Sequence, residues 1–196
     1  MNEKELLIFI DTTTGDPHYQ TVEIQGKRIR EGYSKSFLSW ENILKTGISF
    51  TNKSVCEIGC YLGYFCFKVE LAGACKVLGL DTNKPAIEGA KKIKELSVSS
   101  CEFIRKTAAE EQFLFQHFDI IMVLNVLHHI KRRSNTAFLN TLNQIFNYSS
   151  EVIFEVNTVE ISELEIEAQK YNFKCISKVA SHRAGRQILY FVKGSK

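Results

Sequence analysis

The stretch "SVCEIGCYLGYFCF", residues 54 to 67, decides the fold. It begins as an apolar run that is typical of a strand buried on both faces. The run ends at Glu57 and Gly59, and a helical pattern starts at Gly63. Gly59 allows a tight turn and the close approach of a ligand, while Gly63 lets the next helix pack against the sheet. A strand, a glycine turn and a helix in this order predict a binding site at the end of the strand.

Strand-like and helical segments alternate after residue 53. Several runs are rich in Val, Ile and Phe and apolar at consecutive positions, as in a parallel sheet. Between them, apolar residues recur at helical spacing after Pro85 and again after Ser134. The alternation predicts an α/β fold with a mostly parallel sheet covered by helices on both faces. The predicted strands are residues 53–59, 75–81, 101–105, 118–124 and 150–157.

Both ends of the chain depart from this alternation. Near the C-terminus two strand-like runs are joined by "SHRAG", which predicts an antiparallel hairpin. Near the N-terminus, apolar runs with a turn at Gly26 precede a helical stripe that contains Trp40. These patterns indicate a β/α arm or lid on one domain of ordinary length. The hairpin strands are residues 172–180 and 186–193, the arm is residues 1–50, the core is residues 51–196, and the domain is residues 1–196.

Composition narrows the function classes. The formal net charge of +3 is too small to serve as an electrostatic footprint for nucleic acid, so a nucleic-acid partner is not favoured, although the basic run "KRR" remains a candidate contact. The N-terminal apolar run is too short for a signal peptide or a membrane span, and we expect a cytoplasmic protein without a membrane partner. The six cysteines form no CxxC pair, so we expect reduced core thiols and no metal. The oligomeric state stays open.

The charge beside the glycine turn distinguishes two kinds of nucleotide site. A dinucleotide fingerprint requires G-x-G-x-x-G, but Tyr61 and Tyr64 stand where its second and third glycines belong. Glu57 would also repel a phosphate, whereas it would attract a cation. S-adenosylmethionine carries an ammonium and a sulfonium and no phosphate. At the end of the second predicted strand, Asp81 is placed to accept hydrogen bonds from the hydroxyls of a ribose.

Three motifs together resemble the class I S-adenosylmethionine-dependent methyltransferases: "VCEIGCYLG", "VLGLD" and "FDIIMVLNVLHHI", in this order. The resemblance implies a Rossmann-like seven-stranded sheet whose last strand is antiparallel. "YQTVEIQG" and "GYSKSFLSW" before them are similar to methyltransferases that modify wobble uridine with a carboxymethyl-type donor, and to domains that cap bacterial polysaccharides. The resemblance implies that S-adenosylmethionine is bound by Glu57, Gly59, Cys60, Tyr61, Gly63, Asp81, Thr82, Asn83, Thr107, Ala108, Leu124, Asn125 and Val126.

Two positions depart from the pattern of the family. Tyr61 replaces a small residue in the glycine loop, so the loop is bulkier or supplies an aromatic wall. After the third strand the family usually has an Asp for the adenine, and here Thr107 and the backbone of Ala108 would have to serve. A neutral hydroxyl is a weaker acceptor than a carboxylate, so the affinity for the cofactor would be lower.

The residues that we expect to activate or bind the methyl acceptor lie after the fourth predicted strand and in the predicted hairpin. His128 and His129 suit a general base, and the alternative is that either histidine caps a helix or packs under the sheet. Arginine suits bidentate binding of an anion, but a short basic run is also common at a solvated helix. The candidate substrate-binding residues are Arg132, Arg133, Arg183 and Arg186.

These observations favour methyl transfer to a small molecule or a polymer end, with an anionic substrate. Oxygen is the expected acceptor atom, and nitrogen and carbon stay open. One alternative is modification of tRNA wobble uridine with a carboxylated donor. Another is a domain that binds the cofactor or a partner without turnover. A nicotinamide oxidoreductase ranks last, because the glycine loop lacks the dinucleotide fingerprint.

Overall fold

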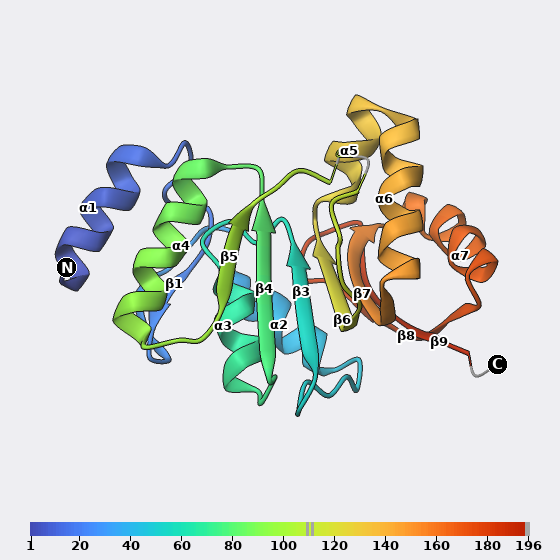
Figure 1. Cartoon of the computed structure of the whole chain (residues 1–196), viewed down its shortest axis with the longest axis horizontal. Helices are drawn as coiled ribbons and strands as arrows, with labels where there is room; N and C mark the ends of the chain where they lie inside the picture. The colour runs from blue at the N-terminus through green and yellow to red at the C-terminus, as the bar shows by residue number, and fades with distance from the viewer. Residues whose placement is uncertain (109, 111, 195–196) are drawn as a thin grey trace.

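A seven-stranded sheet forms the centre of the computed structural model, which describes residues 1–108, 110 and 112–194 (Figure 1). Its strand order is β5-β4-β3-β6-β7-β9-β8, and only β9 runs antiparallel to its two neighbours. This confirms the predicted mostly parallel sheet with an antiparallel last strand. The strands are β3 (Ser54–Ile58), β4 (Lys76–Asp81), β5 (Glu102–Arg105), β6 (Phe118–Leu124), β7 (Ser149–Asn157), β8 (Phe173–Ala180) and β9 (Arg186–Lys193).

Helices cover both faces of the sheet, as predicted. One apolar cluster joins the sheet to α3 and α4 and contains Phe65 and Ile87. A second cluster on the opposite face joins it to α6 and α7 and contains Phe146 and Leu164. The helices of the core are α3 (Tyr64–Leu71), α4 (Lys84–Ser97), α5 (Leu127–Arg133), α6 (Asn135–Asn147) and α7 (Ile161–Lys170), with the 3₁₀ turn η1 (Thr158–Glu160) before α7.

Local sequence signals explain where two of these helices begin. The Asn83 side chain accepts a hydrogen bond from the Ala86 N–H at 3.2 Å, and Pro85 occupies the first turn of α4. The Ser134 hydroxyl does the same for the Ala137 N–H at the start of α6, at 3.1 Å. None of the described helices is long and apolar enough to cross a bilayer.

The N-terminal segment adds a small layer beside α4 (Figure 1). Its first helix buries Leu6 and Ile10 in a cluster that includes Ile93 of α4. A two-stranded ribbon follows and turns at Gln25 and Gly26, both of which have positive φ. The elements of this arm are α1 (Glu3–Thr13), β1 (Val22–Ile24), β2 (Lys27–Arg30) and α2 (Ser36–Leu44).

The strand order reverses at β3. This strand pairs in parallel with β4 on one side and with β6 on the other. In the register of these pairs, Ile58 lies opposite both Leu80 and Val123. The chain therefore leaves three neighbouring strands at the same edge, and such a reversal point is where open α/β sheets form a ligand crevice.

Candidate active site

An open cleft of about 1330 Å³ lies at this edge of the sheet. Residues that follow β3, β4, β5 and β6 line it, together with residues of α5 and of the N-terminal arm. The structure thus brings together most of the residues that the sequence suggested. Those predicted site residues that line the cleft are Gly59, Tyr61, Asp81, Thr82, Thr107, Ala108, Leu124, Asn125, Val126, His129 and Arg133.

The glycine turn after β3 has no room for side chains at its two glycines. Gly59 has a φ of +82°, and a Cβ there would overlap the Cγ2 atom of Val126. Gly63 has the same φ, and a Cβ there would lie 2.6 Å from the ring of Phe103. Positive φ is inexpensive only for glycine, so both the backbone and the packing require these residues. Gly63 packs against the Phe103 ring and allows the turn to form, but it does not line the cleft.

Asp81 holds the turn in place. One carboxylate oxygen accepts a hydrogen bond from the Tyr61 N–H at 2.8 Å, and the other accepts one from the Asn83 N–H at 2.8 Å. Each carboxylate oxygen has two lone pairs, so each keeps one for a further donor. The partly buried carboxylate at the cleft is therefore oriented to accept two hydroxyl groups, as a ribose diol would require. Asn83 itself caps α4 and does not line the cleft.

Glu57 lies beneath the turn, and its residue is only 2% exposed. The Cys66 thiol donates a hydrogen bond to its carboxylate at 3.1 Å. Burial raises the pKa of Glu57 to about 8, the carboxylate of Asp81 adds to the effect, and the Cys66 thiol opposes it. No cation among the described residues forms an ion pair with Glu57. A cationic ligand group would restore the charged form.

Glu57 lines a narrow chamber, with room for little more than a water molecule, rather than the cleft. The chamber and the cleft share Tyr19, Gly59, Leu124 and Asn125 as lining residues, so the two spaces adjoin. Arg183 lines the chamber and not the cleft.

The N-terminal arm supplies an aromatic rim to the cleft. The Tyr61 hydroxyl donates to the backbone carbonyl of Asp16 at 2.6 Å, and the Tyr33 hydroxyl donates to the Asp16 carboxylate. This last bond raises the pKa of Tyr33 to about 12. Tyr19 meets Tyr33 and Tyr61 edge to face, with ring centroids 5.6 Å apart in both pairs. Tyr61 therefore lines the cleft with an aromatic ring, which is one of the two roles that its place in the glycine loop suggested.

Arg186 is engaged in a network with Asn125 instead of lining the cleft. Its guanidinium donates to the side-chain carbonyl of Asn125, which lies at a positive φ of 60°. The amide of Asn125 donates in turn to Glu155 at 2.5 Å, and the Ser181 hydroxyl donates to the other oxygen of Glu155. The network fixes the loop after β6, and it occupies the group that was expected to bind substrate.

The two histidines of α5 differ in position. His129 is exposed and lines the cleft with Arg133, whereas His128 is partly buried, and neither His128 nor Arg132 lines the cleft. Burial lowers the pKa of His128 to about 4, and His129, Arg186 and Arg132 add to the effect. Burial and the same arginines, with Arg133, lower the pKa of His129. His129 is the histidine that an acceptor in the cleft would meet, and it is neutral at pH 7.

Sequence reasoning missed several residues of the site. Asp16 lies in a turn of the arm and carries no motif, and Gln20 bonds the Tyr64 N–H at 3.3 Å behind the glycine turn. Glu155 had a usable signal, because it is an acid inside the apolar run of β7, as Glu57 is in β3. Cys60 is fully buried and packs under the turn, so its side chain faces the core.

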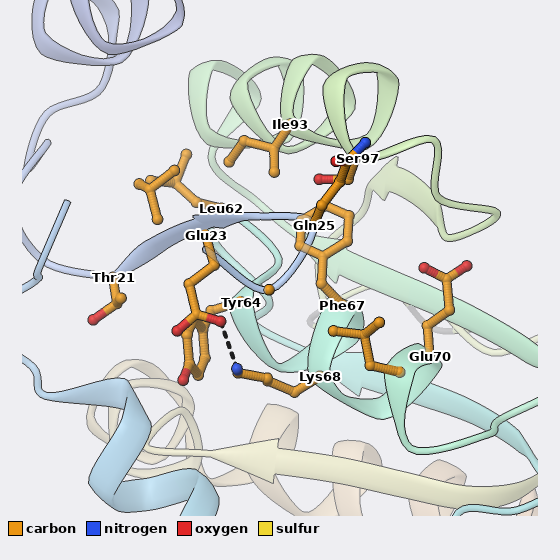
Figure 2. A pocket seen from close by; sticks show the side chains of 13 residues that line it. Thr21, Glu23, Gln25, Leu62, Tyr64, Phe67, Lys68, Glu70, Ile93 and Ser97 are labelled. Atoms are coloured by element: carbon orange, nitrogen blue, oxygen red, sulfur yellow. Dashed lines mark ion pairs between the residues drawn. The ribbon is translucent and has the colours of Figure 1, made fainter. Parts of the chain in front are cut away.

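A further cavity of about 460 Å³ lies away from the cleft, between the ribbon of the arm and helices α3 and α4 (Figure 2). Figure 2 shows the ion pair of Glu23 and Lys68 at its wall. No predicted site residue lines this cavity.

All six cysteines are free thiols, and no group of three His, Cys, Asp or Glu residues in the described ranges is arranged to hold a metal ion.

The fold and the site define a class of protein. The sheet has the strand order and reversal point of an open α/β domain. The cleft offers a carboxylate for a ribose, and the adjoining chamber offers a buried acid for a cation. The donor set fits S-adenosylmethionine, because Glu57 lies at the glycine turn where a dinucleotide places its pyrophosphate, and a carboxylate there would repel a phosphate. The chain is a class I S-adenosylmethionine-dependent methyltransferase domain.

Comparison with known proteins identifies the family. Residues 49–192 match the family model described as "Methyltransferase domain", and the chain belongs to this family. A tRNA U34 carboxymethyltransferase of Nautilia profundicola is 29% identical over 129 residues, which are 66% of this chain and 42% of the relative. One from Colwellia psychrerythraea is 26% identical over 129 residues, 66% of this chain and 39% of the relative. The chain therefore spans about two fifths of the length of these curated relatives.

Solved structures share the fold. A magnesium protoporphyrin IX methyltransferase of Synechocystis PCC 6803 with bound S-adenosylmethionine has a TM-score of 0.65 and 16% identity, and the match covers 81% of this chain and 77% of that one. A putative S-adenosylmethionine-dependent methyltransferase of Listeria monocytogenes has a TM-score of 0.66 and 17% identity, over 82% and 100% of the two chains. The class I fold and the likeness to wobble-uridine-modifying enzymes are thus confirmed.

Proposed function

We propose that this domain transfers the methyl group of S-adenosylmethionine to an oxygen of a small anionic molecule or of a polymer end. The observation that carries the proposal is the pair of acids on either side of the glycine turn. Asp81 is held by two backbone N–H groups with lone pairs to spare, and Glu57 is buried without a cation. A ligand with a ribose at one end and a positive charge at the other satisfies both.

The residues of the chain would act mainly by alignment. The donor supplies a methyl group that its sulfonium already activates, so the protein has to orient donor and acceptor and exclude water. In this proposal Asp81 binds the ribose, and Tyr19 and Tyr61 shield the cleft from solvent. His129 accepts the proton of the acceptor hydroxyl, since its imidazole is neutral at pH 7 and lines the same cleft. Arg133, also in the cleft, binds an anionic group of the acceptor.

Calorimetric titration tests the donor. We expect S-adenosylmethionine and S-adenosylhomocysteine to bind and NAD⁺ not to bind. A screen of hydroxyl acceptors with and without a carboxylate or phosphate, read as formation of S-adenosylhomocysteine, then tests the acceptor. Binding of NAD⁺ in preference to S-adenosylhomocysteine would contradict the proposal, and turnover with neutral acceptors alone would remove the anionic class.

A second candidate is carboxymethyl transfer to the wobble uridine of tRNA. The curated relatives with this name favour it, and so do the arginines near the cleft and chamber, which could pair with a carboxylated donor or with RNA phosphates. The discriminating experiment offers the protein an anticodon stem-loop with either S-adenosylmethionine or its carboxylated form. Carboxymethylated uridine in the product would favour this candidate over simple methyl transfer.

A cofactor-binding domain without turnover has less support. That function would be favoured if the histidines and the hairpin arginines lay outside any cavity. Instead, His129 lines the cleft and Arg183 lines the chamber. Binding of the donor without turnover on any acceptor in the screen would restore this alternative.

A further inference from the structure

The side chain of Asn125 lies between two side chains of opposite charge. The Arg186 guanidinium donates a hydrogen bond to its carbonyl, and its amide N–H donates to the Glu155 carboxylate at 2.5 Å. No ion pair among the described residues includes Arg186 or Glu155, so the amide separates the two charges. The Asn125 side chain is therefore a neutral bridge between a cation and an anion.

The two charges fix the orientation of this amide. Turning the amide over would place its NH2 group against the guanidinium and its carbonyl against the carboxylate, so that donor faces donor and acceptor faces acceptor. The backbone of Asn125 is held as well, because its N–H donates to the Glu155 carbonyl at 3.1 Å. Asn125 has a φ of 60°, a left-handed conformation that asparagine and aspartate adopt more readily than most residues do.

Glu155 depends on this bridge because it is buried. The residue is only 1% exposed, and its other carboxylate oxygen accepts a hydrogen bond from the Ser181 hydroxyl. A buried carboxylate is costly unless hydrogen bonds and a nearby cation offset its desolvation. Ser181 and Asn125 supply the hydrogen bonds, and Arg186 supplies positive charge on the far side of the amide. Loss of Arg186 would leave the buried charge less well compensated.

The bridge joins three separate parts of the fold. Glu155 is on β7, Arg186 is the first residue of β9, and Asn125 directly follows β6. The loop between β8 and β9 belongs to the same network, since the Ser181 hydroxyl also accepts a hydrogen bond from the Arg183 N–H at 3.1 Å. The turn between β6 and α5 is therefore tied to the C-terminal hairpin, which lies far from it in the sequence.

This turn borders the cleft. Asn125 lines the cleft, and the next residue, Val126, lies so close to Gly59 that a Cβ at Gly59 would overlap its Cγ2 atom. Val126 is also the N-cap of α5, the helix that places His129 and Arg133 in the cleft. A shift of the turn would therefore move the wall beside the glycine turn and the start of α5 together.

We infer that Arg186 and Glu155 are positioning residues for the active site, and that they act through Asn125 to hold the turn between β6 and α5. The inference rests on the proposed function and deepens it, because it gives Arg186 a role other than substrate binding. Arg186 does not line the cleft, and its charge faces a group of the protein. The bridge holds the turn before donor and acceptor arrive, which is the preorganisation that their alignment requires.

Exchanging charges along the bridge tests the inference by calorimetric titration with S-adenosylhomocysteine. Asn125→Asp keeps the preference for the positive φ but sets a second carboxylate against Glu155, so it should weaken binding by at least about 10-fold. Adding Glu155→Gln removes the repulsion and leaves the new carboxylate beside Arg186. This double variant should recover the affinity to within about threefold. A loss of packing alone would not be reversed by a second substitution.

NMR of the valine methyl groups reports the position of the turn without any ligand. The Val126 signals should shift in Asn125→Asp and return in the double variant. The signals of Val98, which is exposed at the end of α4, should stay in place. Arg28→Met is the matched control, because it removes an arginine from β2, outside the cleft. It should change neither the Val126 signals nor the affinity.

A second pair of variants covers the case in which Asn125→Asp does not fold. Arg186→Met should weaken binding and shift the Val126 signals, and adding Glu155→Gln should reverse part of both effects, since no buried charge remains. Unchanged affinity or unchanged Val126 signals in the single variants, or double variants no better than the single ones, would overturn the inference. Failure of the unaltered protein to bind S-adenosylhomocysteine would contradict the proposed function, and the Val126 signals would still test the bridge.

Discussion

The Cys66 thiol donates a hydrogen bond to the Glu57 carboxylate at 3.1 Å, and it is the one side chain among the described residues that does so. Both residues lie in the core, Glu57 on β3 and Cys66 on α3. A thiol is a weak donor, so it compensates little of the cost of burying a carboxylate. The consequence is a pKa of about 8 for Glu57 in the ligand-free protein.

Glu57 should make the free energy of unfolding fall as the pH rises. Its pKa is 4.5 in the ordinary state and about 8 in the fold, so between these values the folded protein holds a proton that the unfolded chain has released. The contribution of Glu57 to the free energy of unfolding is then largest below pH 4.5 and falls by about 1.4 kcal/mol per pH unit up to pH 8. Urea unfolding of the unaltered protein and of Glu57→Gln at pH 5.5, 7 and 8.5 measures this, because the difference between the two isolates Glu57.

Two variants of Cys66 test whether the pH dependence arises from Glu57. Loss of the thiol removes a group that lowers the pKa of Glu57, so the decline in stability should extend to higher pH. Cys66→Ser supplies a stronger donor and should end the decline at lower pH. If the free energies of unfolding of the unaltered protein and of Glu57→Gln changed with pH in parallel, Glu57 would already be ionised in the folded protein at pH 5.5, contrary to this prediction.

Binding of the donor should release a proton. A ligand ammonium beside Glu57 favours the carboxylate, so binding lowers its pKa and about one proton leaves at pH 7. Titration calorimetry with S-adenosylhomocysteine in two buffers of different ionisation enthalpy counts the protons. Glu57→Gln should abolish the release. An unchanged proton count in that variant would assign the titration to another group.

Much of the fold could be predicted because local pattern and burial agree. The runs at 118–124 and 186–193 became β6 and β9 with the predicted bounds, and the other strands differ by a residue or so. Helix α7 had no assignment in the sequence analysis, because its buried residues, Leu164 and Ala168, are too few for a clear apolar stripe. The apolar run in α1 likewise gave no helical assignment, although Leu6 and Ile10 lie one turn apart.

The site was less predictable than the fold. Residues next to strand ends, such as Asp81 and Asn125, follow from the rule that ligands bind at the carboxyl edge of the sheet. Tyr19 and Asp16 reach the cleft only because the arm folds back over that edge, and no local pattern encodes such a long-range contact. The role of Arg186 depended on the pairing of β9 with β7, which sets Arg186 opposite Asn157 and near the network of Asn125.

Asp81 should matter for the cofactor more than for the fold. Asp81→Ala removes the acceptor for the ribose, and the affinity for S-adenosylhomocysteine should fall by about 1.5 to 3 kcal/mol. Asp119→Ala is the matched control. Its carboxylate accepts hydrogen bonds from Ser54 at 2.7 and 2.8 Å at the other end of β3, so it should lower stability and leave the dissociation constant unchanged. Unchanged binding by Asp81→Ala would remove Asp81 from the site.

Gly59→Ala should destabilise the protein through a steric overlap. A Cβ at this position overlaps the Cγ2 atom of Val126, in addition to the cost of the positive φ. Gly47 also has a positive φ, of +84°, but open space around it, so Gly47→Ala measures the backbone cost alone. We expect Gly59→Ala to cost about 1 to 3 kcal/mol more than Gly47→Ala in urea unfolding. Equal costs would show that Val126 yields without strain.

The two histidines of α5 should titrate at low pH. Burial and the cations around them lower both pKa values, that of His128 to about 4. The unfolded chain binds these protons before the folded protein does, so His128 makes stability rise between about pH 4 and 6.5, and His129 acts in the same direction. Titration of the imidazole protons by NMR measures each pKa. Arg132→Gln removes a cation close to both rings and should raise both values slightly, whereas the part due to burial remains. A His128 ring that is already charged at pH 6 would contradict the lowering of its pKa by burial.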